Sequence, residues 1–378
     1  MSEDIGKYKI VIIAGEVSGD MHGAKLISAL NSIHPELAIS GIGGDLMTKE
    51  GLQVIYHIEQ MAFLGIGEIL KHLPFIRRVF KDMVQYICSN RPDAVVLIDY
   101  PGFNLKLAKA VSKRGISIIY YISPQLWAWG KRRVKIIKKY VDKMMVIFPF
   151  EVSFYQQFGI ETEYVGHPLV DSHYNKVVIK ESKSQGKIVL GLLPGSRKQE
   201  VENLLPDMLV TASILKQKGK IDAAVIARSN TIPLEYYQKQ IKGYDFVSIH
   251  QSSLDEFYIT LDVALVSSGT ATLETAYFQV PMVIVYRVNP LTWFLGKLLV
   301  NLDYIGLANI VAGEKIADEL LQGQFIPDKA ASLLGNLLEP EINKGMREKL
   351  KIIQQKLGAP GASLRAAQSI IKYLKEKN

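Results

Sequence analysis

The stretch Ala94-Val95-Val96-Leu97-Ile98-Asp99, followed by Tyr100-Pro101-Gly102, decides the fold of this chain. Its unbroken aliphatic run begins after the turn proline Pro92 and ends at a Pro-Gly turn, which is typical of a buried strand in a parallel sheet. Similar runs alternate with helical patterns along the first half of the chain, at Tyr8–Ala14, Ala38–Ile42, Ile116–Ile122 and Lys143–Phe148. Alternating strands and helices predict a parallel sheet that is covered by helices on both faces.

The second half repeats this organisation after the polar stretch Asn175–Lys187, which lacks a sustained apolar period and is predicted to be a linker. We therefore expect an α/β protein with two Rossmann-like, doubly wound domains, residues 1–174 and 188–345, that face each other across a cleft. Residues 346–378 are predicted to form two helices that cross back or are exchanged in a dimer. The strands of the second domain are expected at Ile188–Leu192, Ala223–Ala227, Phe246–Ile249, Val263–Val266 and Met282–Tyr286.

Composition and length restrict the class of protein. The chain has 378 residues, 48% of them hydrophobic and 22% charged, so it is long enough for two folded domains and is not a disordered chain. Its single cysteine, Cys88, excludes an internal disulfide and a cysteine metal cluster, and suits a reducing cytosol. A net charge of +8 allows an anionic membrane, nucleic acid or a phosphorylated substrate as partner.

Targeting and membrane-spanning signals are weak. Met1–Lys9 is polar and leads directly into a strand, so no signal peptide is expected. The longest apolar candidate, Pro290–Val300, is interrupted by Lys297 and is shorter than the roughly 20 residues that a membrane-spanning helix needs. We predict a cytoplasmic protein that does not span the membrane.

Two loops that follow predicted strands favour a nucleotide. Glycine at 195 and at 269 permits close approach of a phosphate, and hydroxyl groups and free N–H groups surround both positions. Arg197 has the planar guanidinium that pairs with phosphate, and Glu274 lies about one helical turn further on, where it would accept hydrogen bonds from a ribose. Ordinary strand-to-helix turns with a capping acid are the alternative. The residues expected to bind the nucleotide are Gly195, Ser196, Arg197, Gly269, Thr270, Ala271, Thr272 and Glu274.

The first loop of the chain has a different character. It lacks G-x-G-x-x-G, and the chain has no Gly-Lys-Ser/Thr, so neither a dinucleotide site nor a P-loop is supported. Its polar groups are expected to bind the hydroxyls of a substrate, or to cap the helix that follows. His167, in the segment Val165-Gly166-His167-Pro168, is expected either to orient a ligand or to be a structural histidine. The substrate-binding residues predicted here are Glu16, Ser18, Gly19, Asp20 and His167.

Asp99 is the candidate general base. It ends a strongly apolar strand, where partial removal from water raises the basicity of a carboxylate. The alternative is a structural aspartate that accepts N–H bonds from the turn at Tyr100-Pro101-Gly102. No Asp-x-Asp or histidine-rich metal signature occurs, so we expect no metal and no cofactor.

Residues Met61–Met83 combine apolar residues at helical spacing with interspersed lysine and arginine. Such a segment lies on a membrane surface or, more commonly, packs on a protein core with its basic side in water. The excess of large apolar residues before Pro74 favours the membrane. A second basic and aromatic cluster, Trp127–Lys139, lacks a recognisable nucleic-acid module, so no nucleic-acid partner is expected. The predicted membrane-facing residues are Met61, Phe63, Leu64, Ile66, Ile69, Leu70 and Leu73.

Seven motifs, in order from about residue 8 to residue 325, resemble the lipid A disaccharide synthase family. The resemblance implies the GT-B architecture and an inverting glycosyltransferase. The seven motifs are Gly15-Glu16-Val17-Ser18-Gly19-Asp20, Ile98-Asp99-Tyr100-Pro101-Gly102-Phe103-Asn104, Ser123-Pro124-Gln125-Leu126-Trp127-Ala128-Trp129, Val165-Gly166-His167-Pro168, Leu193-Pro194-Gly195-Ser196-Arg197, Ser268-Gly269-Thr270-Ala271-Thr272-Leu273-Glu274 and Ala308-Asn309-Ile310-Val311-Ala312-Gly313.

The resemblance also implies a reaction and its partners. A 2,3-diacylglucosamine passes from UDP to the 6-hydroxyl of 2,3-diacylglucosamine 1-phosphate, and a β-1,6 disaccharide and UDP are formed. It gives Asp99 the base role, places Arg197 and Asn309 at the nucleotide, and makes the enzyme a peripheral protein on the cytoplasmic face of the inner membrane, with a homodimer through its C-terminal portion. Many members carry a second acid where this chain has Gly102, so the base role rests on Asp99. The alternatives are a UDP-sugar epimerase and a non-catalytic nucleotide-binding protein of the membrane surface.

Overall fold

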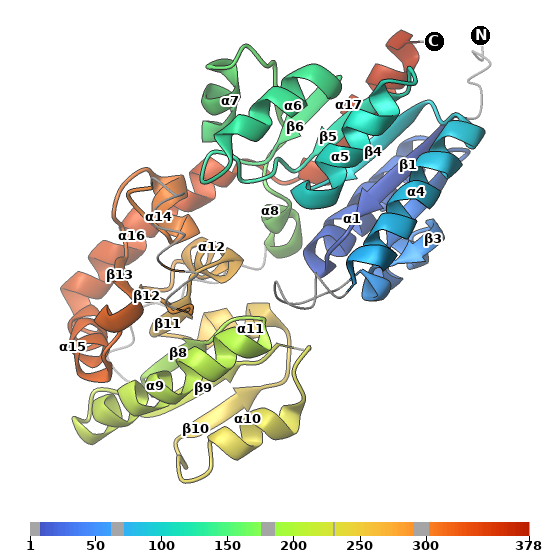
Figure 1. The fold of residues 1–378 in the computed structure, drawn as a ribbon. Coiled ribbons are helices and arrows are strands. Elements are labelled where there is room, and N and C mark those ends of the chain that lie inside the picture. The colour runs from blue at the N-terminus through green and yellow to red at the C-terminus, as the bar shows by residue number, and fades with distance from the viewer. Residues whose placement is uncertain are drawn as a thin grey trace. The chain divides into compact units, whose positions relative to one another are not determined.

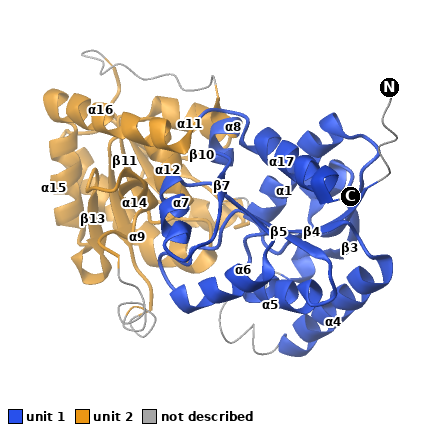
Figure 2. Ribbon diagram, turned by 90° about the horizontal axis from the view of Figure 1, so that it is seen from above, with its two compact units in different colours: residues 1–171, 359–378 blue, residues 172–358 orange. Residues whose placement is uncertain are grey.

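The computed structural model describes residues 8–61, 72–174, 186–229, 231–289, 293 and 302–377. The chain divides into two compact units, shown in separate colours in Figure 2. Unit 1 consists of residues 1–171 and 359–378, and unit 2 of residues 172–358. Each unit contains a parallel sheet between helices (Figure 1). The predicted linker, Asn175–Lys187, lies for the most part outside the described residues.

The sheet of unit 1 has seven parallel strands in the order β3-β2-β1-β4-β5-β6-β7. The central strands β1, β4 and β5 are almost wholly buried, as their unbroken apolar sequences require. The strands are β1 (Lys9–Ala14), β2 (Ala38–Gly43), β3 (Gln53–His57), β4 (Ala94–Ile98), β5 (Ser117–Tyr121), β6 (Lys143–Val146) and β7 (Glu163–Tyr164).

Helices cover both faces of this sheet (Figure 1). One face packs on α4, α5 and α6, whose apolar residues share a core cluster with β1, β4 and β5. On the other side, α1 packs against α17, the last helix of the chain. The helices of unit 1 are α1 (Val17–Ile33), α2 (Asp45–Lys49), η1 (Ile58–Gln60), α4 (Leu73–Asn90), α5 (Pro101–Ser112), η2 (Lys131–Arg133), α6 (Val134–Tyr140), α7 (Pro149–Gln156), α8 (Pro168–His173) and α17 (Ala362–Lys377); α8 ends in unit 2.

The sheet of unit 2 has six parallel strands in the order β10-β9-β8-β11-β12-β13. They are β8 (Val189–Leu193), β9 (Ala223–Ala227), β10 (Val247–His250), β11 (Val263–Ser267), β12 (Met282–Tyr286) and β13 (Asp318–Leu321). The helices are α9 (Lys198–Gln217), α10 (Leu234–Gln240), α11 (Leu254–Thr260), α12 (Thr270–Tyr277), α14 (Leu307–Ala312), η3 (Gln322–Gln324), α15 (Pro327–Leu337) and α16 (Pro340–Leu357).

The two helices of the C-terminal tail belong to different units. The segment Gly358–Gly361 separates the two helices. Helix α16 packs on α12, α14 and α15 of unit 2, whereas α17 packs on α1 of unit 1. The predicted single tail, residues 346–378, is therefore divided between the units.

In both sheets the strand order reverses beside the first strand of the unit. The reversal lies between β1 and β4 in unit 1 and between β8 and β11 in unit 2. Loops that leave neighbouring strands at such a reversal turn to opposite faces of the sheet and open a crevice in which α/β proteins bind their ligands.

Candidate active site

In unit 1, the reversal brings the first loop of the chain beside Asp99. Strands β1 and β4 pair in parallel with Ala14 opposite Ile98, so Gly15 and Asp99 leave adjacent strand ends. A Cβ atom on Gly15 would lie 2.2 Å from the ring of Tyr100, so only glycine allows this approach. The loop with Glu16 and the turn with Asp99 therefore form one site.

The turn at Asp99 has an unusual backbone. Asp99 and Tyr100 both have left-handed conformations, with φ of 44° and 45°, although neither is glycine. Two buried side chains hold the turn: Asn104 Nδ2 and the Tyr120 hydroxyl donate to the carbonyl oxygen of Asp99, at 2.8 and 2.6 Å. A conformation held in this way fixes the direction of the Asp99 side chain.

The environment of Asp99 suits a base. Burial raises the pKa of its carboxyl to about 7, and the negative charge of Glu16 adds to the effect, while a hydrogen bond from the backbone N–H of Tyr100 lowers it. The structural role that was the alternative for Asp99 is thus present as one hydrogen bond from the Tyr100 N–H. Burial has the larger effect on the pKa of Asp99. A carboxyl with this pKa exchanges protons readily near neutral pH.

Asn104 and Tyr120 were missed as parts of this site, although Asn104 lies in one of the motifs. Asn104 is fully buried on α5, and its amide also donates to the carbonyl of Ile98, at 3.2 Å. A polar residue among the apolar positions of a helix was the available signal. For Tyr120, within an apolar strand, the sequence offered none.

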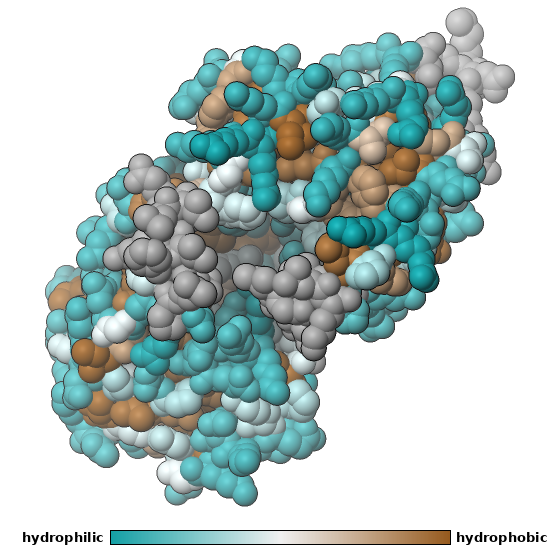
Figure 3. Space-filling view, in the orientation of Figure 1, coloured by the Kyte–Doolittle hydropathy of each residue, from teal (hydrophilic) through white to brown (hydrophobic). Residues whose placement is uncertain are grey.

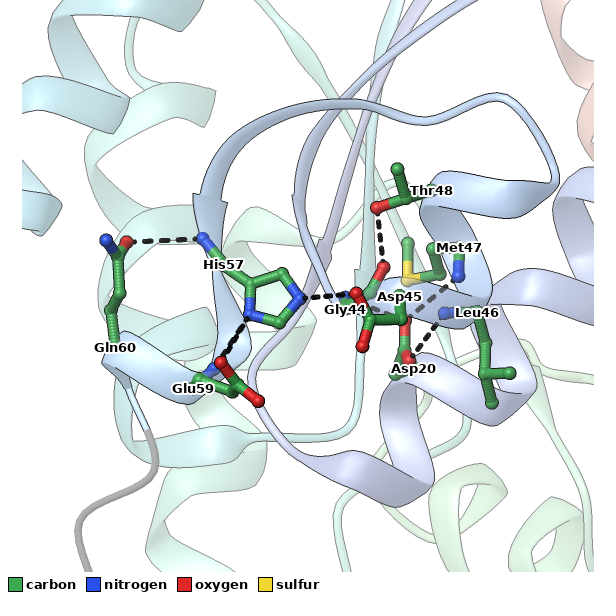
Figure 4. Close-up of polar contacts among 9 residues, drawn as sticks. All are labelled: Asp20, Gly44, Asp45, Leu46, Met47, Thr48, His57, Glu59 and Gln60. Atoms are coloured by element: carbon green, nitrogen blue, oxygen red, sulfur yellow. Dashed lines mark hydrogen bonds and ion pairs between the residues drawn. The ribbon is translucent and has the colours of Figure 1, made fainter.

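Asp20 has a structural role that corrects its predicted contact with a substrate. It is 4% exposed, and its carboxylate accepts the N–H groups of Gly44, Leu46 and Met47, at 2.7, 3.2 and 3.1 Å (Figure 4). These donors open α2, which has no other side-chain cap. Asp20 therefore caps a helix other than its own, and its oxygens are occupied.

The other first-loop residues differ in exposure. Glu16 and Ser18 are exposed at the start of α1, while Gly19 is buried with its Cα against Ala14, where a Cβ would lie 3.2 Å from the Ala14 Cβ. The two exposed side chains are available to a ligand. Gly19 contributes by letting α1 approach the sheet.

His167 caps the helix that follows it. Its Nδ1 accepts the N–H of Leu169 at 3.1 Å, and its ring lies against Phe148. Burial, together with the nearby His22 and Lys25, lowers the pKa of His167 to about 3, so the ring is neutral at physiological pH. Through Nδ1, His167 therefore has the structural role that was the alternative to binding a ligand. This contact uses one of the two nitrogens of its ring.

In unit 2, the two glycine loops leave paired strands. Strands β8 and β11 pair with Leu193 opposite Val266, and the loops at Gly195 and Gly269 follow directly. Gly195 has φ of 110°, and a Cβ there would lie 3.2 Å from Ser267 Oγ, so the loops are in close contact. The structure thus brings together the two loops that the sequence linked only by their composition.

The groups expected to bind phosphate at Gly195 already hold a carboxylate. Glu200 accepts the N–H groups of Ser196 and Arg197, at 3.2 and 3.3 Å, and pairs with the Arg197 guanidinium at 2.9 Å. The Arg197 side chain is 62% exposed, so the pair is weak and open to solvent. The arrangement shows that these groups can surround an anion.

Around Gly269 the predicted residues fall into two groups. Gly269 has φ of 151°, and, apart from its chain neighbours, no atom of the described residues lies within 4 Å of the place that its Cβ would take. It leads into the first helical residues, Thr270, which is exposed, and Ala271, which is half-buried. Thr272 is fully buried instead, donates to the Gly269 carbonyl at 2.8 Å and accepts the N–H of Ala308. Its predicted contact with a ligand is wrong, because its hydroxyl holds the loop.

Asn309 is also a structural residue. It is fully buried, with its two amide hydrogens donated to Ala317 O and Glu319 Oε1 and its oxygen accepting the N–H groups of Ile316 and Ala317. These bonds saturate a side-chain amide. The predicted direct contact with the nucleotide is therefore replaced by support of the chain that joins α14 to β13.

Glu274 lies on α12 as the prediction requires. The Tyr258 hydroxyl donates to its Oε2 at 3.1 Å, and burial raises the pKa of the Glu274 carboxyl. Within the described part of the chain, the other oxygen, Oε1, accepts no hydrogen bond, which leaves an acceptor for a ligand hydroxyl.

The predicted membrane-facing residues are only partly described. Phe63, Leu64, Ile66, Ile69 and Leu70 lie outside the described residues. Met61 is 3% exposed within the core cluster, so its prediction as a membrane-facing residue is wrong; the turn that follows η1 points it inward. Leu73 is half-buried at the start of α4.

Helix α4 is amphipathic in the manner expected. Phe75, Ile76 and Phe80 are half-buried against the core, and Arg77 and Arg78 are exposed. Figure 3 shows hydrophobic side chains between hydrophilic ones where α4 and α5 lie. Among the described residues, no helix is long and apolar enough to cross a membrane.

Comparison with known proteins gives a consistent result. A family model described as lipid-A-disaccharide synthetase matches residues 10–368. The lipid-A-disaccharide synthase of Trichlorobacter lovleyi is 37% identical over 380 residues, covering 98% of this chain and 99% of its own length. That of Geobacter sulfurreducens is 38% identical over 379 residues, with 97% of each chain covered.

Solved structures share the fold at low identity. MurG of Acinetobacter baumannii superposes with a TM-score of 0.59 at 15% identity, over 97% of this chain and 99% of its own. The UDP-GlcNAc 2-epimerase of Methanocaldococcus jannaschii, solved with UDP-GlcNAc and UDP, gives a TM-score of 0.58 at 13% identity, over 97% and 99%. These likenesses establish the two-domain GT-B fold, which glycosyltransferases and epimerases have in common.

Proposed function

Because this chain belongs to the lipid-A-disaccharide synthetase family, and is therefore a glycosyltransferase of lipid A biosynthesis, we propose the following reaction for it. It transfers 2,3-diacylglucosamine from UDP to the 6-hydroxyl of 2,3-diacylglucosamine 1-phosphate with inversion. The products are the β-1,6 disaccharide 1-phosphate and UDP. The observation that carries the mechanism is the partly desolvated carboxyl of Asp99 at the strand reversal of unit 1.

Asp99 acts as the general base. Its carboxylate takes the proton of the acceptor 6-hydroxyl while that oxygen attacks the anomeric carbon from the face opposite UDP. The bond between the anomeric carbon and the diphosphate oxygen breaks, and its electron pair leaves with UDP. One base suffices for this single displacement, in agreement with glycine at position 102.

Unit 2 binds the donor nucleotide. The N–H groups of Ser196 and Arg197, the Arg197 guanidinium and the start of α12 at Gly269, Thr270 and Ala271 stabilise the charge that develops on the diphosphate. The diphosphate takes the position that the Glu200 carboxylate occupies. Glu274 accepts the ribose hydroxyls.

The acylated substrates place the enzyme on a membrane. We propose that residues 63–73 and the basic side of α4 bind the cytoplasmic face of the inner membrane, and that the C-terminal portion forms a homodimer. Phe80 of α4 packs edge-on against Phe103 of α5, and Phe103 lies against Tyr100, so α4 is connected through α5 to the turn that carries Asp99. Light scattering of the purified chain measures whether its mass is that of one chain or two.

The variant Asp99→Asn tests the base. The amide has the same shape and tolerates the left-handed backbone, but it cannot take a proton, so turnover is expected to fall at least about a hundredfold while UDP binds as before. Asp93→Asn is the matched control, because Asp93 precedes the same strand and binds the N–H of Lys9 at 2.7 Å. Near-normal turnover of Asp99→Asn would remove Asp99 from the mechanism.

A further inference from the structure

In unit 2, a group of charged and aromatic residues packs together and reaches Glu274. His173, the last residue of α8, hydrogen bonds through Nδ1 to Asp255 Oδ1 on α11. The two side chains are 9% and 18% exposed. His173, the second residue of unit 2, is thus paired with another residue of that unit.

Aromatic rings hold this histidine in place. The His173 ring meets Phe278 edge-on with centroids 5.1 Å apart, and Tyr277 lies at 6.2 Å. Phe278 in turn stacks on Tyr258 at 4.9 Å, and the Tyr258 hydroxyl donates to Glu274. One packed group therefore connects His173 to the carboxylate that is proposed to bind ribose.

The electrostatic effect of the group on Glu274 has opposing parts. Burial raises the pKa of Glu274; the charge of His173 and the hydrogen bond from Tyr258 lower it, and Asp255 raises it. Among the effects that oppose burial, the charge of His173 is the largest. A carboxylate accepts two hydrogen bonds from vicinal hydroxyls, whereas a protonated carboxyl loses acceptor capacity.

The other elements that pack on α12 affect the pKa of Glu274 less directly. α14 has the sequence LANIVA, and β11 has VALVS, so neither carries a charge, and the titratable residue of β12 is Tyr286. From α16, Arg347 binds the carbonyls of Gln279, Leu261 and Asp262, and Lys356 binds that of Ala312.

We propose that His173 is a positioning residue for the donor nucleotide, which keeps the Glu274 carboxylate in the form that accepts the ribose hydroxyls. The proposal rests on the proposed function, since it assigns a uridine nucleotide to unit 2. His173 acts through Glu274 and does not touch the ligand. The hydrogen bond to Asp255 and the contact with Phe278 hold the His173 ring at a fixed place.

The variant His173→Gln tests this role, because glutamine can still donate to Asp255 but carries no charge. We expect its affinity for UDP to be within about twofold of the wild type at about pH 8 and about threefold to tenfold weaker at about pH 6. The wild type should prefer UDP over 2′-deoxy-UDP and 3′-deoxy-UDP by about tenfold, and this preference should shrink in His173→Gln at the lower pH. Calorimetry of the full chain measures each affinity.

Two further variants secure the comparison. Tyr258→Phe removes the other group that lowers the pKa of Glu274, so it should shift the pH dependence in the same direction if His173→Gln does not fold. His250→Gln is the matched control, a histidine of unit 2 that contacts Ser253 O, and it should behave as the wild type.

The outcomes separate the two proposals. An unchanged pH dependence and ribose preference in both His173→Gln and Tyr258→Phe, with normal UDP binding, overturns the role of His173 alone. A wild-type chain that binds no UDP at either pH overturns the proposed function together with this inference.

Discussion

Asp99 shows how one residue acquires its chemistry from its neighbours. The apolar strand before it supplies the burial, and Glu16 from the adjacent loop supplies a like charge. The sequence indicated the first effect, because a carboxylate at the end of such a strand is partly desolvated. It did not indicate the second, since Glu16 and Asp99 become neighbours only through the pairing of β1 with β4.

This environment predicts the pH dependence of the reaction. Since the base must be deprotonated and its pKa is about 7, kcat/KM should rise with pH and level off above a midpoint near neutrality. Glu16→Gln removes a charge that raises this pKa, so the midpoint should move to lower pH. The pH–rate profile of each protein measures it.

Glu59→Gln serves as the control for that profile. Glu59 is exposed and pairs with His57 at 3.6 Å, so its charge acts at another place in unit 1. A midpoint that is the same in Glu16→Gln and Glu59→Gln contradicts the effect of Glu16 on Asp99.

Among the elements, the central strands were predicted, and three of the four edge strands were missed; the fourth, β10, was expected at Phe246–Ile249. The three strands without a predicted counterpart, β3, β7 and β13, all lie at sheet edges. Their sequences, QVIYH, EY and DELL, are short or mixed, because an edge strand is only partly buried and needs no continuous apolar run. The structural roles of Asp20, Thr272 and Asn309 were missed for a related reason. Their backbone partners lie far away in sequence or in turns that no local pattern reveals.

The docking of α17 depends on a cap from a distant residue. Asp171 accepts the N–H groups of Gly361, Ala362 and Ser363, at 2.6, 3.1 and 3.1 Å. Asp171→Ala should lower the free energy of unfolding by about 1–2 kcal/mol and speed amide hydrogen exchange in α17. Urea denaturation and exchange mass spectrometry measure the two effects.

Asp328→Ala is the control for this cap. Asp328 is an exposed acid in the first turn of α15, and its loss should change stability by a few tenths of a kcal/mol. If exchange in α17 is equally slow in Asp171→Ala and the wild type, the cap does not hold the helix.

At the scale of the whole molecule, the chemistry is divided between two units of similar construction. Each has a parallel sheet with one strand-order reversal, and the predicted residues gather at these reversals: Glu16 and Asp99 in unit 1, Gly195 and Gly269 in unit 2. The sequence predicted this organisation because buried parallel strands and the loops after them have strong local signals. Such signals do not decide whether the C-terminal helices cross back or are exchanged in a dimer, because the packing of α17 on α1 of unit 1 depends on long-range contacts.

Membrane binding is a property of the whole molecule as well. Replacing Phe63, Leu64, Ile66 and Ile69 with serine should reduce sedimentation with anionic liposomes about tenfold or more, because each apolar side chain contributes to burial in the lipid boundary. The control replaces four apolar residues that are exposed elsewhere, Val210, Ile326, Ile342 and Leu364. Equal sedimentation of the two variants contradicts the proposed surface.

The most direct test of the central claim is product analysis with purified protein, a UDP-2,3-diacylglucosamine and a 2,3-diacylglucosamine 1-phosphate in mixed micelles. We predict one β-1,6 disaccharide 1-phosphate for each UDP released, with neither product formed when the acceptor is omitted. Release of an epimerised sugar, or no UDP release with both substrates present, would contradict the account.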